Sequence, residues 1–117
     1  MLIALGGVLQ ATAATEEELL ALHETYSDAM NAHNAEEVAT YFHEDAVYGY
    51  LPMPPPMNGR QEIAAGFASV FQAFPDWHVE QRRILVSGNI MVTECTITGT
   101  QLGEWAGIPA TGKTIQT

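Results

Sequence analysis

Cysteine and basic residues are scarce in this chain. Its 117 residues include a single cysteine, Cys95, which excludes an internal disulfide and any zinc site built from several cysteines. Four lysines and arginines stand against fourteen acids, so the net charge is −10 and the clustered cations that nucleic-acid binding requires are missing. The same charge disfavours an anionic membrane surface. Because Cys95 lies in an apolar stretch, we expect a buried, unreactive thiol.

Long apolar runs and metal-binding spacings are also missing. Residues 1–14 are mostly apolar, but they are too few to span a bilayer and lack the basic start of a secretory signal. We therefore expect an apolar N-terminal extension over residues 1–14, one domain over residues 15–117, and a cytoplasmic protein. The four histidines show no His-x-x-x-His or Glu-x-x-His spacing, so the sequence predicts no metal site and no cofactor.

Helical periodicity is present in three segments. Thr15 and Glu18 have the spacing of a capping box, and apolar residues follow at helical intervals to about residue 32. Asn34 gives a second capping signal, for a short helix that ends near residue 42. A third helix is predicted over residues 59–74. An apolar content of 47% is typical of a folded globular domain.

A long β-hairpin is predicted after the helices. Two stretches rich in β-forming residues, 77–86 and 90–101, are joined by Ser87-Gly88-Asn89, which favours a tight turn. The apolar alternation of the first stretch changes phase across Gln81-Arg82-Arg83. Such a change predicts a β-bulge, which would bend the sheet.

Shorter extended segments flank these elements. Residues 46–50 predict a short strand, and Lys113 begins another one. The proline-rich segment 51–57 is expected to form a stiff loop, because proline cannot donate to a strand ladder. Three helices followed by an antiparallel sheet indicate the α+β class.

The end of the third helix and the hairpin carry a set of short motifs. They are Phe74-Pro75-Asp76-Trp77, Gly99-Thr100, Gly103-Glu104-Trp105, Gly107-Ile108-Pro109 and Thr111-Gly112-Lys113. In these motifs the chain resembles the SnoaL-like (polyketide or ester cyclase) branch of the NTF2-like superfamily, over roughly residues 15–117. The resemblance implies a cone-shaped roll, in which three N-terminal helices pack in a strongly curved, mainly antiparallel sheet.

The resemblance also implies an apolar cavity for a small molecule, with no cofactor. Aromatic and methionine side chains are the candidates for its walls, although such a side chain is more often an ordinary core residue than a ligand contact. The predicted pocket residues are Tyr26, Met30, Phe42, Tyr48, Tyr50, Met53, Phe67, Phe71, Trp77 and Trp105.

Proton transfer in such a cavity would need a titratable side chain. Glu94 is the only acid between residues 90 and 98, and a carboxyl on the concave face of the sheet would suit a general acid or base. His78 and Glu80 share one strand face and are further candidates. The alternative places Glu94 on the convex face opposite Arg82 or Arg83, and the other two on a solvated face.

Three more titratable residues have structural explanations. Asp76 follows a helix-stopping proline, where a carboxylate can accept hydrogen bonds from backbone amides. His33 and His43 flank the short second helix, and we expect both to be exposed. None of the three is predicted to be catalytic.

Two departures from the family bear on function. SnoaL-like cyclases continue past Thr-Gly-Lys into further strands, one of which carries an acid-base aspartate that has no counterpart before Thr117. The histidine that commonly follows Gly-Thr is Gln101 here. Two hypotheses remain: a cofactor-independent cyclase, isomerase or hydrolase, and a non-catalytic ligand-binding or dimerisation domain. We expect either residues 2–9 or a second subunit of a homodimer to cover the open edge of the shortened sheet.

Overall fold

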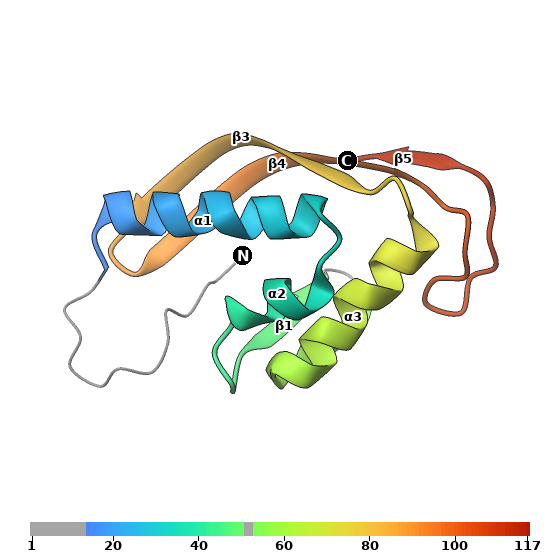
Figure 1. Cartoon of the computed structure of the whole chain (residues 1–117), viewed down its shortest axis with the longest axis horizontal. Coiled ribbons are helices and arrows are strands. Elements are labelled where there is room, and N and C mark those ends of the chain that lie inside the picture. The colour runs from blue at the N-terminus through green and yellow to red at the C-terminus, as the bar shows by residue number, and fades with distance from the viewer. Residues whose placement is uncertain (1–13, 51–52) are drawn as a thin grey trace.

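The computed structural model describes residues 14–50 and 53–117 (Figure 1). The order of its elements confirms the predicted α+β class, with helices first and a hairpin after them. The elements are α1 (Glu16–Asn31), α2 (Ala35–Thr40), β1 (Val47–Tyr50), β2 (Met53–Asn58), α3 (Gly59–Ala73), β3 (His78–Ser87), β4 (Ile90–Thr100) and β5 (Thr114–Gln116). Apart from Ala14, the predicted N-terminal extension lies outside the described residues.

The helices begin at the predicted caps. At the start of α1, the Thr15 hydroxyl accepts a hydrogen bond from the Glu18 amide at 3.1 Å, and the Glu18 carboxylate accepts one from the Thr15 amide at 3.2 Å. This reciprocal pair is a capping box and satisfies two amides that no helical carbonyl can reach. Asn34 caps α2 in the same way, through the Glu37 amide at 3.1 Å.

The β3–β4 hairpin forms an arch over α1 (Figure 1). Its strands pair antiparallel, and Gly88 in the turn takes a φ of 59°, which glycine adopts without steric cost. The register shifts between Gln81 and Arg83, which confirms the predicted bulge. Strand β5 pairs with the other side of β4, so the sheet order is β3-β4-β5. The bulge lies where curvature is needed for the sheet to follow the helix.

Residues 53–57 of the proline-rich segment belong to strand β2, so their prediction as a loop is wrong, and residues 51–52 lie outside the described residues. Strand β2 pairs antiparallel with β1 in a separate two-stranded sheet, with Val47 opposite Asn58 and Tyr48 opposite Met57. In a two-stranded sheet each strand needs hydrogen bonds on one side only. The missing proline amides are tolerated there, and the register is irregular between Tyr48 and Tyr50.

One side chain fixes α1 to the edge of the arch. The amide of Asn31 donates to the Val79 carbonyl at 3.0 Å, and its oxygen accepts from the Val79 amide at 2.8 Å. Asn31 thereby takes the place of a neighbouring strand at an edge that would otherwise be unpaired. These two bonds set how α1 lies against the inner face of β3.

Candidate functional site

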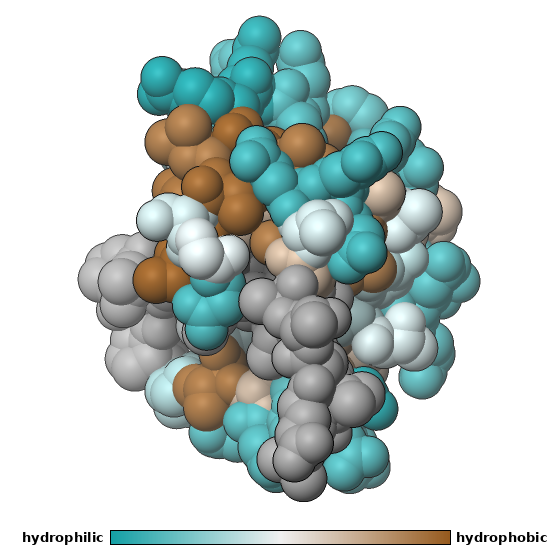
Figure 2. Space-filling model, turned by 90° about the vertical axis from the view of Figure 1, so that its left-hand side faces the viewer, coloured by the Kyte–Doolittle hydropathy of each residue, from teal (hydrophilic) through white to brown (hydrophobic). Residues whose placement is uncertain are grey.

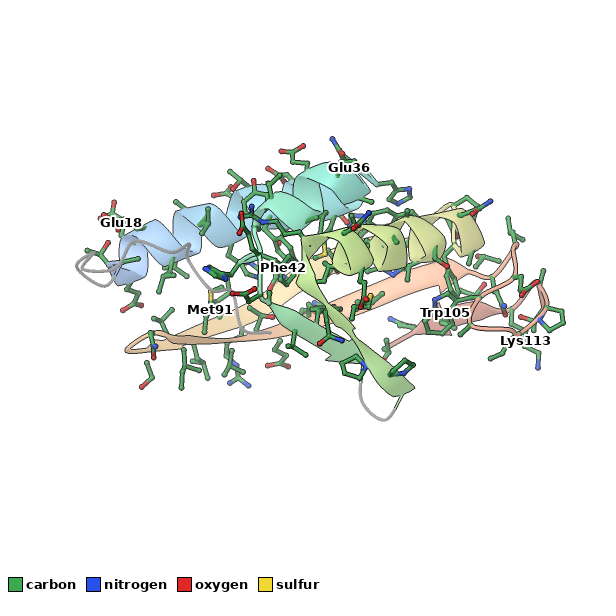
Figure 3. The ribbon with its side chains drawn as sticks, turned by 90° about the horizontal axis from the view of Figure 1, so that it is seen from below. Glu18, Glu36, Phe42, Met91, Trp105 and Lys113 are labelled. Atoms are coloured by element: carbon green, nitrogen blue, oxygen red, sulfur yellow. The ribbon has the colours of Figure 1, made fainter. Side chains whose placement is uncertain are left out.

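Most of the predicted pocket residues come together in the core between the arch and the helices. Figure 3 shows Phe42 in the middle of this core. Its ring contacts those of Tyr26 and Tyr48 edge-on, with centroids 5.9 and 5.5 Å apart. The cluster also buries Met30, Phe67, Phe71 and Trp77, and Tyr48 packs against it half-buried. The side chains of Tyr50 and Met53 lie outside the described part of the structure.

Trp105 packs half-buried against one end of this core. It packs edge-on against Phe74, with ring centroids 5.8 Å apart, in the loop that follows β4. Figure 3 places it at the opposite end of the molecule from Met91, with Phe42 between them. The loop that carries Trp105 folds back on the end of α3, where Leu102 and Gly103 donate to the Ala73 carbonyl, and the place of Trp105 in a pocket stays a prediction.

Glu94, His78 and Glu80 all lie on the outer face of the hairpin. The Glu94 carboxylate is 2.7 Å from the Arg83 guanidinium, and both side chains are more than half exposed. His78 and Glu80 are also exposed, on the same strand face. The two-residue period of β4 turns Glu94 outward and Met91 inward, so the concave placement of Glu94 is wrong and the alternative, on the convex face opposite Arg83, is confirmed.

No carboxyl of the chain lies on the inner face. All fourteen acids fall within the described residues, and every one of them is exposed. Acid-base chemistry under the arch would therefore require a side chain of another type.

His23 is a fully buried titratable side chain, and the sequence did not single it out. It lies on α1 with no exposed surface, and its ring is tilted against that of Tyr26 at 5.7 Å. Its Nδ1 is 3.4 Å from the Ser27 hydroxyl, one helical turn later. The Gln81 amide of β3 in turn donates to the Ser27 oxygen at 3.5 Å. A chain of three polar groups thus joins α1 to the inner face of the sheet at the bulge.

Each end of this chain carries a buried atom without a hydrogen-bond partner. These atoms are Nε2 of His23 and Oε1 of Gln81. Burial lowers the pKa of His23 below its ordinary value near 6.5, so the ring is neutral at neutral pH. Unpaired buried polar groups are rare in folded proteins, and a ligand or an ordered water is the usual partner.

Asp76 has the structural role that the sequence predicted, with a more distant partner. Its two carboxylate oxygens accept hydrogen bonds from the Thr100 amide at 2.6 Å and the Thr100 hydroxyl at 2.8 Å. These bonds hold the pKa of Asp76 below its ordinary value of 3.8. The carboxylate therefore ties the end of α3 to strand β4.

Of the two histidines predicted to be exposed, His33 is half-buried. It takes a φ of 57°, its ring stacks on Phe71 at 4.8 Å, and its Nε2 donates to the Trp77 carbonyl at 2.6 Å. The prediction for His33 is wrong because the turn after α1 directs the ring back onto α3. His43 is also half-buried, so its prediction is wrong as well, and its Nδ1 accepts a hydrogen bond from the Asp45 amide at 3.2 Å.

Gln101 organises the loop after β4. Its buried amide donates to the carbonyls of Gly103, Ile108 and Pro109 at 3.2 to 3.3 Å, and its oxygen accepts from the Thr111 hydroxyl at 2.8 Å. This side chain satisfies four groups of a loop that contains little regular structure. Its role is to hold the loop, which explains why a polar residue is buried here.

The described residues hold neither a membrane-spanning helix nor a cluster of metal ligands. No helix in this part of the chain is long and apolar enough to cross a membrane. No three histidine, cysteine or acidic side chains lie close enough together, within residues 14–50 and 53–117, to hold a metal ion.

The comparisons with known proteins agree on one fold family. Residues 20–117 match the profile of the family described as SnoaL-like polyketide cyclase. No curated protein matches the chain. Among solved structures, TsrD from Streptomyces laurentii has a TM-score of 0.73 at 22% identity, with 88% of this chain and 75% of TsrD covered.

Two further structures extend this similarity. A protein from Jannaschia sp. CCS1, whose name places it among SnoaL-like polyketide cyclases, has a TM-score of 0.77 at 19% identity, over 92% of this chain and 76% of its own. A protein from Catenulispora acidiphila with a ketosteroid isomerase-like fold, in complex with trimethylamine, has a TM-score of 0.70 at 18% identity. The alignment covers 88% of this chain and 71% of that one. These structures show that the chain shares their α+β fold.

Proposed function

Because the chain belongs to the SnoaL-like polyketide cyclase family, we propose that it binds an apolar small molecule under the arch, beside α1. The proposal includes cofactor-independent acid-base chemistry of the cyclase, isomerase or hydrolase type. One observation carries it: the inner face of the sheet and α1 together present two buried, unpaired polar atoms, at His23 and Gln81. They lie beside an aromatic core that suits an apolar ligand.

The energetics of these two atoms support a ligand. Leaving one buried polar group without a partner costs about 1–3 kcal/mol. A molecule that supplies a matching acceptor and donor recovers this cost on binding, and the aromatic side chains add apolar contact. The site therefore selects a molecule that is mostly apolar and carries a small number of polar atoms.

Binding of a neutral bicyclic ketone, 2-tetralone, tests this proposal. We expect saturable binding in ligand-detected NMR, together with an increase of the thermal unfolding temperature. At a concentration 100-fold above Kd, the stabilisation from binding amounts to about 2.7 kcal/mol. Exchanging Phe67, at the centre of the core, for a smaller residue should weaken binding, whereas exchanging the exposed Leu102 should not. Absence of saturable binding to the folded protein would refute the proposal.

A specific observation favours the second candidate function, a dimerisation domain. Leu85 and Val92 form a cross-strand pair on the outer face of the hairpin, and with Ile90 they are more than half exposed. Figure 2 views the end of the molecule that holds the β3–β4 turn and shows apolar side chains gathered among hydrophilic ones. On this alternative a second copy of the chain covers the pair. Sedimentation would then show a dimer that the Leu85→Lys variant dissociates, and a monomer at all concentrations would exclude it.

A further inference from the structure

We infer that His23, held by Ser27 and Gln81, is the proton-transfer group of the ligand site, and that its ligand is neutral and carries both a hydrogen-bond acceptor and a donor. This inference rests on the proposed function. Its basis is the contact of α1 with β3 at the bulge, where Ser27 links His23 to Gln81.

A comparison with the carboxyls, His33, His78 and Cys95 points to His23. Every carboxyl is exposed, so none can act under the arch. The Nε2 atom of His33 is already bonded to the Trp77 carbonyl, and His78 lies on the outer face. Cys95 is half-buried, not fully buried as expected, and this partial burial raises the pKa of its thiol, which stays protonated. His23 combines full burial with a ring nitrogen that has no partner.

The hydrogen-bond chain can run in either direction. A serine hydroxyl and a glutamine amide can each donate and accept. In one direction the Gln81 amide donates to Ser27 and the Ser27 hydroxyl donates to Nδ1 of His23, which places the ring proton on Nε2 and leaves Oε1 of Gln81 as an acceptor. With the Gln81 amide turned over, its oxygen accepts from the Ser27 hydroxyl, and the Ser27 oxygen accepts from the N–H at Nδ1 of His23. His23 Nε2 is then an unprotonated base, and Gln81 presents an N–H.

Both directions leave one donor and one acceptor facing the ligand. In the second direction the unpaired atoms are a base and an N–H donor, the pair that proton abstraction next to a carbonyl requires. Nε2 takes a proton from the α-carbon, and the electron pair of that C–H bond shifts to the carbonyl oxygen, forming an enolate. The Gln81 N–H hydrogen-bonds to the enolate oxygen. Return of a proton from Nε2 to carbon restores the ketone and the neutral imidazole.

The distribution of charge indicates a neutral ligand. The four basic residues, Arg60, Arg82, Arg83 and Lys113, are all exposed. No lysine or arginine side chain would therefore compensate the desolvation of a ligand carboxylate beside His23, which is strongly unfavourable. An uncharged ketone or alcohol avoids this cost.

The test follows exchange of the α-protons of 2-tetralone with deuterium oxide by NMR. We expect the wild-type chain to accelerate exchange over buffer. The His23→Gln variant keeps a polar group near Nε2 but has no base, so it should still bind 2-tetralone while exchange falls by roughly a hundredfold or more. His78→Gln, on the outer face of the same sheet, is the matched control and should behave as wild type.

A second variant, Ser27→Ala, tests whether Ser27 positions the His23 ring. Ser27→Ala removes the link between His23 and Gln81, and we expect it to change the ring tautomer seen in nitrogen-15 spectra and to lower the exchange rate. 2-Naphthylacetate, a carboxylate of similar size, should not compete with 2-tetralone.

The outcomes keep the two proposals distinct. If the wild type does not bind 2-tetralone, the proposed function fails. If it binds without exchange, or if His23→Gln exchanges as fast as wild type, the assignment of proton transfer to His23 is overturned while binding stands. Equal competition by 2-naphthylacetate overturns the neutral-ligand inference. An unchanged His23 nitrogen signal at saturating 2-tetralone would show that a buried water alone satisfies Nε2. That result would also overturn the assignment of proton transfer to His23.

Discussion

Replacing Asn31 with alanine should destabilise the protein by separating α1 from the edge of β3. The substitution removes both hydrogen bonds to the Val79 backbone, and Val79 is buried, so water replaces them poorly. At about 0.5–1.5 kcal/mol for each bond, the expected loss is about 2 kcal/mol in the free energy of unfolding. For a domain of this length that corresponds to a fall of about 8 °C in Tm.

Urea unfolding and amide hydrogen exchange measure this effect. The Val79 amide should exchange faster in Asn31→Ala than in wild type, because its acceptor is gone. Asn89→Ala is the matched control, since Asn89 is exposed in the hairpin turn, and its free energy of unfolding should change by less than about 0.5 kcal/mol. Equal stability of Asn31→Ala and wild type would show that the side chain does not hold α1 to the sheet.

Four further outcomes follow from the structure. Gln101→Leu should lower the free energy of unfolding by about 2 kcal/mol in urea and speed proteolysis within residues 102–112. Proteolysis of these residues at the wild-type rate would show that Gln101 does not hold the loop. The folded pKa of His23 lies below 6.5, so wild-type stability should fall as pH drops from 6.5 towards that value, and His23→Gln should lack this component. The folded pKa of Asp76 lies below 3.8, so its contribution should persist above pH 3.8 and disappear as pH falls through the lowered pKa; Asp76→Asn should show no such loss. Glu94→Gln should lower the free energy of unfolding by at most about 1 kcal/mol and leave the rate of 2-tetralone exchange unchanged. Loss of exchange in this variant would show that Glu94 takes part in the reaction.

Local signals in the sequence predicted much of the fold. The capping box of Thr15 and Glu18 depends on residues three apart, and the bulge at Gln81-Arg82-Arg83 shows as a change of phase within one strand. Both are readable without knowledge of the rest of the chain. The proline-rich strand β2 was missed because its pairing depends on β1 and on the position of both strands in a two-stranded sheet.

The candidate site was less predictable because it joins distant segments. Ser27 and Gln81 are 54 residues apart, and a histidine on the apolar face of a helix resembles any other core residue until its partners are known. The one available signal was the spacing of His23 and Ser27, which puts both on the face of α1 that also carries Asn31. Alternation alone did not reveal which face of the hairpin the arch would turn inward, so Glu94 was a candidate until the ion pair with Arg83 was seen.

The central claim is that α1 presents a neutral, buried imidazole to a ligand under the arch. Nitrogen-15 NMR of the histidine rings, with and without 2-tetralone, tests it most directly. We predict that His23 titrates below 6.5 and that its Nε2 signal shifts on saturation with 2-tetralone, while the signals of His78 stay unchanged. A His23 ring that titrates at or above 6.5, or an Nε2 signal that 2-tetralone does not move, would contradict the claim.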